Sequence, residues 1–111
     1  MPPLRLTVAD ALSRLPGAIG ERYVELFRHG TLSVELYAPR GVDPQSPHTR
    51  DEVYMVVTGR GQFRNGGERH PFEPGDVLFV PAGVTHRFEE FTEDLVVWVI
   101  FYGPVGGEKV G

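Results

Sequence analysis

Two segments of the chain carry side chains that could do chemistry together. In the first, His48 stands four residues before Glu52, which opens the strand-forming run EVYMVVT. In the second, PGDVLFVPAGVTHRF, glycine and proline turns flank a short apolar strand and lead to His86. Imidazoles and carboxylates pair with each other, transfer protons or bind divalent metal ions. On its own, the pair of His48 and Glu52 would be an ordinary ion pair on a strand surface, so the second segment decides what they can do.

Strand geometry indicates where these side chains point. Residues two apart on a strand share a face, so His48 and Glu52 are expected on the same side of a regular strand. The same parity applies around His86. By this reasoning, the candidates for lining a pocket near the three residues are Tyr54, Phe88 and Glu90.

The elements that position these residues are expected to be mostly short strands. Fourteen glycines and ten prolines are more than a helical bundle of 111 residues would tolerate. One short helix is expected in TVADALSRLPG, where Thr7 can cap the start, and Pro16 with Gly17 can end it. The pattern predicts an all-β antiparallel sandwich or barrel. Alternation predicts strands at 23–29, 32–37, from near His48 to 58, 62–65, 69–72, 77–80, 85–88 and 95–102.

Length and composition narrow the class of protein. The chain is long enough for a single domain over residues 1–111, with a barrel core of about 22–102 and a glycine-rich, flexible tail at 103–111. A net charge of -4 without a basic cluster argues against nucleic-acid binding. The absence of cysteine excludes disulfides and thiolate ligands. Without a signal peptide or a membrane span, a soluble cytoplasmic protein is expected.

Two of the expected strands are apolar on both faces. In EVYMVVT and LVVWVIFY neither face is polar, whereas an antiparallel sheet with one side in water should alternate. A second surface is therefore expected to cover the outside of this sheet. The N-terminal segment and another subunit are the two alternatives, and a homodimer is predicted on this ground.

The two segments resemble the paired motifs of the cupin superfamily, which are small β-barrels with a metal site inside the barrel. The first motif is matched from His48 through Glu52 to Gly59, and the second at Gly75, Pro81, Gly83 and His86. The resemblance covers about residues 41–90. It implies a double-stranded β-helix, or jelly-roll barrel, whose metal ligands are His48, Glu52 and His86.

The chain departs from these motifs where the family has a further ligand. Ser46 stands in place of the first histidine of the family pattern, and Glu90 in place of its final asparagine. Two histidines and one carboxylate remain, which is the ligand set of non-haem Fe(II) oxygenases, and this set would also accept Mn, Ni, Co or Zn. Gln45 and Ser46 are the candidates for a fourth ligand.

Two functions follow from this interpretation. The first is a metal-dependent enzyme acting on a small polar molecule by dioxygenase-like or Lewis-acid chemistry, while the resemblance also allows isomerases and decarboxylases. The second is a non-catalytic module with a degenerate metal site that binds or senses a small ligand. The loss of the first motif histidine favours the second function.

Overall fold

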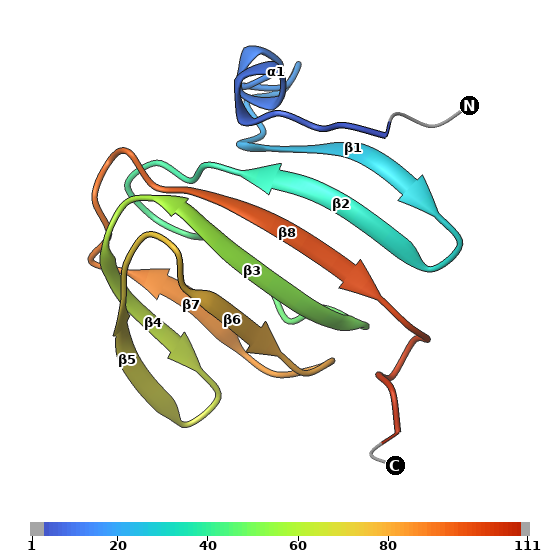
Figure 1. The fold of residues 1–111 in the computed structure, drawn as a ribbon. Coiled ribbons are helices and arrows are strands. Elements are labelled where there is room, and N and C mark those ends of the chain that lie inside the picture. Colours follow the sequence, from blue (N-terminus) through green and yellow to red (C-terminus); the bar gives the residue numbers. More distant parts are fainter. Residues whose placement is uncertain (1–3, 110–111) are drawn as a thin grey trace.

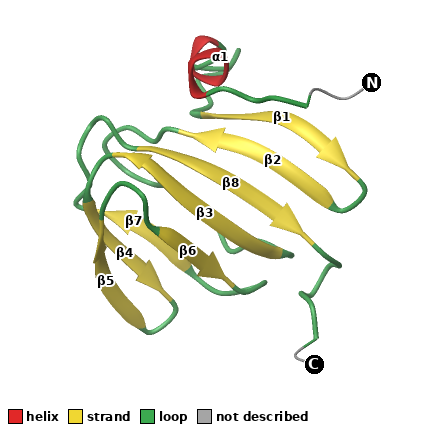
Figure 2. Cartoon of the chain, viewed as in Figure 1, coloured by secondary structure: helices red, strands yellow, loops and turns green. Residues whose placement is uncertain are grey.

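The computed structural model describes residues 4–109, which fold into strands with one short helix (Figure 1, Figure 2). The predicted strands are present, and the prediction of a mostly β chain with a short N-terminal helix is confirmed. The elements are α1 (Val8–Ser13), β1 (Tyr23–His29), β2 (Leu32–Tyr37), β3 (Asp51–Thr58), β4 (Gly61–Asn65), β5 (Glu68–Phe72), β6 (Val77–Val80), β7 (His86–Glu89) and β8 (Val96–Tyr102).

The strands form two antiparallel sheets. The larger sheet has the order β1-β2-β8-β3-β6, and the smaller has the order β5-β4-β7. Side chains from both sheets share one core, in which Phe63 and Phe88 of the small sheet pack with Tyr54 and Val97 of the large one. The architecture is the antiparallel jelly-roll barrel that the sequence predicted.

The unequal width of the sheets creates an uncovered region. The three strands of the small sheet share their core with β3, β6 and β8, together with only the end of β2 at Tyr37. The inner face of β1 and much of that of β2 therefore have no facing strand, and a cavity lies there. The loop between β2 and β3, the segment before β1, and residues of β3 and β8 also line this cavity.

The outer face of the large sheet is covered in part by the N-terminal segment. Thr7 caps α1 by accepting a hydrogen bond from the Asp10 N–H at 3.1 Å, as the sequence predicted. The helix packs on Leu36, Val96 and Trp98. Further along this face, the side chains that stay exposed are Met55, Val77 and Phe79.

A motif glycine ends β3 where the chain comes very close to another segment. Gly59 has a φ of +97°, and a Cβ added there would lie 2.6 Å from the Cα of Leu95. Any other residue would meet both a strained backbone and a backbone clash. This contact explains in physical terms why the motif has glycine at its end.

The tail after β8 returns to the start of β3. The Gly106 N–H donates to the carbonyl of Thr49 at 2.7 Å, and the Glu108 N–H donates to Oδ2 of Asp51 at 2.8 Å. Flexibility of the tail and the single-domain boundaries stay predictions, and residues 110–111 lie outside the described part. No helix within residues 4–109 is both long and apolar enough to cross a membrane.

Candidate metal centre

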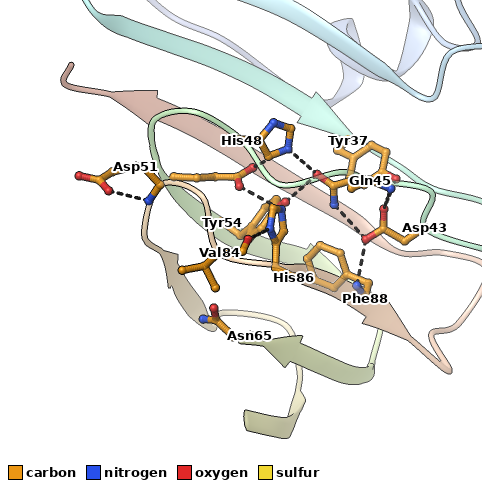
Figure 3. A network of polar contacts seen from close by, with 12 residues as sticks. Tyr37, Asp43, Gln45, His48, Asp51, Tyr54, Asn65, Val84, His86 and Phe88 are labelled. Carbon is orange, nitrogen blue, oxygen red and sulfur yellow. Dashed lines mark hydrogen bonds and ion pairs between the residues drawn. The ribbon is translucent and has the colours of Figure 1, made fainter. Parts of the chain in front are cut away.

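Three predicted ligands meet on the inner face of the large sheet. His48 comes from the loop before β3, Glu52 from β3 itself, and His86 from the first position of β7. One ligand atom from each lies within 4.8 Å of those of the other two. Figure 3 shows His48 and His86 approaching each other from these separate segments. The spacing is that of groups able to share one metal ion.

The two motif segments are also tied by backbone. The strand begins at Asp51 rather than near His48, because the chain bends at residues 49 and 50. The Gly83 N–H, in the turn before β7, donates to the carbonyl of His48 at 2.7 Å. This turn therefore holds His48 in place, although His48 lies outside the regular strand.

Burial differs between the three side chains. Those of Glu52 and His86 are 1% and 0% exposed, whereas that of His48 is 34% exposed. Both carboxylate oxygens of Glu52 and the Nε2 of His86 are buried without a hydrogen-bond partner. Buried polar atoms without partners cost folding free energy, so a cation shared by these atoms would remove the cost.

The tautomer of His86 explains why its Nε2 and Glu52 do not satisfy each other. Nδ1 of His86 lies 2.9 Å from the Val84 carbonyl, which can only accept, so the proton of a neutral ring belongs on Nδ1. Nε2 then presents a lone pair to Oε1 of Glu52, only 3.2 Å away. Two acceptors this close repel unless a proton or a metal ion lies between them. The donor set of this site therefore fits a divalent transition-metal ion.

The pKa values of the two histidines move in opposite directions. Burial lowers the pKa of His48, and the nearby charge of Glu52 only partly offsets this effect. Burial would also lower the pKa of His86, but the Glu52 carboxylate 3.2 Å away and the hydrogen bond from Nδ1 to the Val84 carbonyl outweigh it, so that the pKa is raised. The neutral form that binds a metal ion is thus favoured at His48, whereas at Nε2 of His86 a metal ion competes with a proton.

Gln45 joins the site through its side-chain oxygen. This Oε1 lies 3.1 Å from Nε2 of His48 and accepts a hydrogen bond from the Tyr54 hydroxyl at 2.9 Å. The Gln45 amide nitrogen donates to Oδ2 of Asp43 at 2.9 Å, which fixes the orientation of the amide (Figure 3). A carbonyl oxygen therefore faces His48, where the sequence left a fourth ligand open.

Asp43 is a buried carboxylate that the sequence did not single out. Its side chain accepts hydrogen bonds from the Tyr37 hydroxyl at 2.6 Å and from the Phe88 N–H at 2.9 Å, besides those from Gln45. It thereby connects β2, the ligand-bearing loop and β7. In the sequence, an aspartate in a proline-rich loop looks like an ordinary turn residue. The role of Asp43 could not be predicted because it depends on contacts that only the fold creates.

Replacing Asp43 with asparagine should destabilise the protein. The amide would turn a donor toward groups that already donate, so the free energy of unfolding should fall by about 2–4 kcal/mol. Denaturant unfolding followed by fluorescence measures this change. Tyr37→Phe is the matched control, because it removes one donor and should cost about 1 kcal/mol. An Asp43→Asn protein within about 0.5 kcal/mol of the wild type would contradict the assignment.

A cavity of about 670 Å³ extends from the candidate metal centre along β2. Its wall includes His48, Glu52 and Gln45 at one end. The remaining lining residues are Gly20, Glu21, Arg22, Tyr23, Glu35, Tyr37, Pro39, Arg40, Val42, Pro44, Val99 and Phe101. A cavity of this size accommodates a small organic molecule.

Glu35 lies on the cavity wall, in the middle of β2 and opposite Val99 of β8. Burial, together with the negative charges of Glu25 and Glu52, raises the pKa of Glu35 to about 7. A carboxylic acid with such a pKa can give or take a proton near neutral pH. The sequence did carry a signal, since Glu35 is an acid between Val34 and Leu36 in a short apolar strand.

The Glu35 side chain should make stability depend on pH in the metal-free protein. The pKa of Glu35 is higher in the folded chain than the ordinary 4.5, so ionising this side chain lowers the free energy of unfolding. This loss is absent below pH 4.5 and complete above pH 7. Glu35→Gln should therefore raise the free energy of unfolding by about 1–2 kcal/mol above pH 7, after allowance for solvent screening, and hardly at all below pH 4.5. Unfolding curves at both pH values measure the difference. Glu93→Gln, at an exposed position, should show no such dependence.

The other residues that the sequence suggested as a fourth ligand or as pocket lining are not part of the cavity wall. Ser46 is exposed and is not part of the cavity wall. Tyr54 is buried behind Gln45, and the Phe88 ring is buried in the core, 4.8 Å from that of Phe63. The side chain of Glu90 is 77% exposed and pairs with Arg69 at 3.3 Å. Tyr54 thus contacts the site through Gln45, while the cavity wall is formed by other residues.

The sequence of this chain is similar to a known family and to three known proteins. The family model described as "Cupin domain" matches residues 33–102. An uncharacterized protein of Streptomyces coelicolor is 44% identical over 97 residues, which span 86% of this chain and 92% of that protein. A gentisate 1,2-dioxygenase of a Ralstonia species is 32% identical over 69 residues, and mannose-6-phosphate isomerase 2 of Arabidopsis thaliana is 43% identical over 47 residues. These matches span 61% and 41% of this chain, but only 19% and 11% of the two enzymes.

Solved structures share the fold. A cupin 2 conserved barrel domain protein from Salinispora arenicola superposes with a TM-score of 0.67 over 93% of this chain and 90% of that one, at 20% identity. A cupin-2 domain protein from Shewanella frigidimarina gives a TM-score of 0.66 over 88% of this chain and 94% of that one, at 18% identity. The same barrel therefore forms from sequences that differ at most positions.

Proposed function

This chain belongs to the cupin domain family, and on that premise we propose that it is a metal-dependent enzyme acting on a small polar molecule. His48, Glu52 and His86 hold the ion, which is Fe, Mn, Ni, Co or Zn in its divalent state. The side-chain oxygen of Gln45 is the candidate for a fourth protein ligand.

One observation carries this proposal more than any other. The Nε2 lone pair of His86 faces an oxygen of Glu52 at 3.2 Å, and neither atom has a hydrogen-bond partner. A barrel selected for stability alone would fill such a position with apolar side chains, because unpaired buried charges are costly. Retention of this arrangement beside an open cavity favours a metal-binding role.

The residues around the site have separable roles in this proposal. The Val84 carbonyl holds the His86 ring with Nε2 directed at the ion position, and Tyr54 with Asp43 orients the Gln45 amide. Glu35 holds or releases a proton on the cavity wall. When bound, a divalent transition metal supplies a Lewis acid for a substrate oxygen or, if redox-active, a centre that activates dioxygen.

The proposed reaction is of a broad type, not a single named reaction. Dioxygenase-like or Lewis-acid chemistry fits a set of two histidines and one carboxylate. The partial likeness to a dioxygenase and to an isomerase supports an enzymatic function in general without choosing between these reactions, because a shared fold does not set the reaction.

Metal analysis of protein purified without an affinity tag tests the proposal. Elemental analysis should find close to one equivalent of Fe, Mn, Ni, Co or Zn for each chain. Protein that stays empty after incubation with each of these ions and gel filtration would overturn metal binding. If metal is bound, uptake of dioxygen in the presence of a panel of phenols and keto acids then tests the dioxygenase-like alternative.

The second candidate is a binding or sensing module without catalysis. It is favoured by Ser46, which is exposed at the position where the family pattern has its first histidine, so that only three ligands of that pattern remain. A ligand that copurifies with the protein and is released unchanged would support this function over the enzyme.

Two further proposals concern the oligomeric state and the cellular location of the protein. We propose a homodimer that packs through the exposed side chains of Met55, Val77 and Phe79 on the outer face of the large sheet. Light scattering would give twice the mass of one chain if this is right, and the mass of one chain if it is wrong. The proposed cytoplasmic location is tested by cell fractionation.

A further inference from the structure

Two arginines line the same cavity as the candidate metal centre. Arg22 precedes β1, and Arg40 follows β2. The Nε of Arg22 donates to the Ala38 carbonyl at 2.8 Å, and an Nη1 of Arg40 donates to the same oxygen at 3.3 Å. Because they share one acceptor, the two guanidinium groups are held close together.

The charge of this pair is not neutralised by the protein. Neither arginine has an ion pair in the part of the chain that the structure describes. Burial and the neighbouring charge of Arg40 lower the pKa of Arg22, as expected for two cations without an anion between them. The terminal nitrogens of Arg22 stay available, because only its Nε is used by the protein in this region.

The acids that share the cavity do not supply the missing charge. Glu21 directs its carboxylate at the Ile19 N–H, from which it accepts a hydrogen bond at 2.8 Å, and forms no ion pair with Arg22 or Arg40. Glu35, with its pKa of about 7, is only about half ionised at neutral pH and largely protonated at lower pH. The arginine end of the cavity therefore presents two guanidinium groups without an ion-pair partner among the described residues, which can bind an anion from solution.

The register of the strands separates the arginine end from the metal end. Arg22 accepts the Ala38 N–H beside Tyr37, whereas Glu52 is opposite Phe101, which pairs with Ser33. Ser33 and Tyr37 are four residues apart on β2, which corresponds to roughly 13 Å. Between the two ends the wall is formed by Val99 and Glu35, with Tyr23 and Tyr37 next to the arginines and Phe101 next to the metal end.

We propose that the cavity binds an organic anion with an apolar body. Its carboxylate or phosphate group is held by Arg22 and Arg40, and the apolar body lies along Tyr37 and Val99. The opposite end of the molecule then reaches His48 and Glu52. Only this last statement rests on the proposed function, because anion binding by the arginines does not need a metal.

Three small probes test this assignment by NMR titration of the full chain. Phenylacetate and phenyl phosphate carry the two anionic groups, and phenylacetamide is the neutral counterpart of the first. At least one anion should bind at least tenfold more tightly than the amide, and the tighter anion identifies the preferred group. Arg22→Gln and Arg40→Gln should each weaken anion binding about tenfold and leave amide binding unchanged.

Arg87→Gln provides the matched control. It removes the same charge from an exposed position on β7 that is not part of the cavity wall, so anion binding should stay as in the wild type. The proposal is overturned if the amide binds as tightly as the anions, if both arginine variants retain wild-type anion affinity, or if no probe binds the wild type.

Metal analysis of the same samples keeps the two proposals apart. Both arginine variants should contain as much metal as the wild type, because neither residue contacts the ligand set. Anion binding by a protein that holds no metal would refute the proposed enzyme and leave the anion site standing. A metal-containing protein that binds all three probes equally would refute the anion site and leave the proposed enzyme standing.

Discussion

Replacing His86 with alanine should lower the affinity of the protein for its divalent metal by more than about 100-fold. Loss of a group that merely orients a ligand typically costs 10–100-fold, and loss of a ligand itself should cost more. The Nε2 of His86 points at Glu52 with its lone pair, so no other atom replaces it. Elemental analysis after dialysis against graded concentrations of metal measures the change.

Two further variants make the His86 result specific. His86→Leu keeps more of the buried volume than alanine does and should lose metal equally, which separates ligand loss from damage to packing. His29→Ala removes an exposed histidine at the end of β1 and should retain wild-type affinity. If the alanine and leucine variants fold and keep their metal, the ligand assignment is wrong.

Removal of the metal should lower the melting temperature of the wild type by about 15 °C. At a metal concentration about 1,000 times the Kd, binding adds about 4 kcal/mol to the free energy of unfolding, and a domain of this size shifts by roughly 4 °C for each kcal/mol. Calorimetry with and without a chelator measures the shift. Glu52→Gln should abolish it, because a neutral amide is a far weaker ligand than a carboxylate.

The behaviour of Glu52→Gln in chelator is as informative as its behaviour with metal. Its melting temperature should be the same under both conditions, whereas Glu68→Gln, at an exposed position, should keep the full difference of the wild type. A chelator that leaves the wild type unchanged, or a shift that persists in Glu52→Gln, would show that the ion binds elsewhere or not at all.

Local sequence patterns predicted the strands and the motif residues well. β6 is present at 77–80 as expected, and Thr7 caps the helix, because alternation and capping are decided by neighbours in sequence. His48 is more instructive. Strand parity placed it on the side of Glu52, but it lies before the strand begins, and the turn at Gly83 holds it there.

The rest of the site could not be predicted because it depends on which strands become neighbours. Arg22 and Arg40 are far apart in sequence and meet only because β1 pairs with β2 and Ala38 accepts from both. Asp43 resembles a turn residue until the Phe88 N–H approaches it. Glu90 shares the parity of His86, but it follows the end of β7 with a φ of 49°, and its side chain turns outward to Arg69.

The mismatch between five strands and three has a consequence for how fast ligands exchange. Tyr23 and Val42, which line the cavity over the uncovered strands, are 53% and 66% exposed, so the pocket has a lateral mouth. A small molecule can pass through such a mouth while the barrel stays rigid. Association should accordingly follow a single kinetic phase whose rate rises in proportion to ligand concentration, without the plateau that a slow conformational gate would impose.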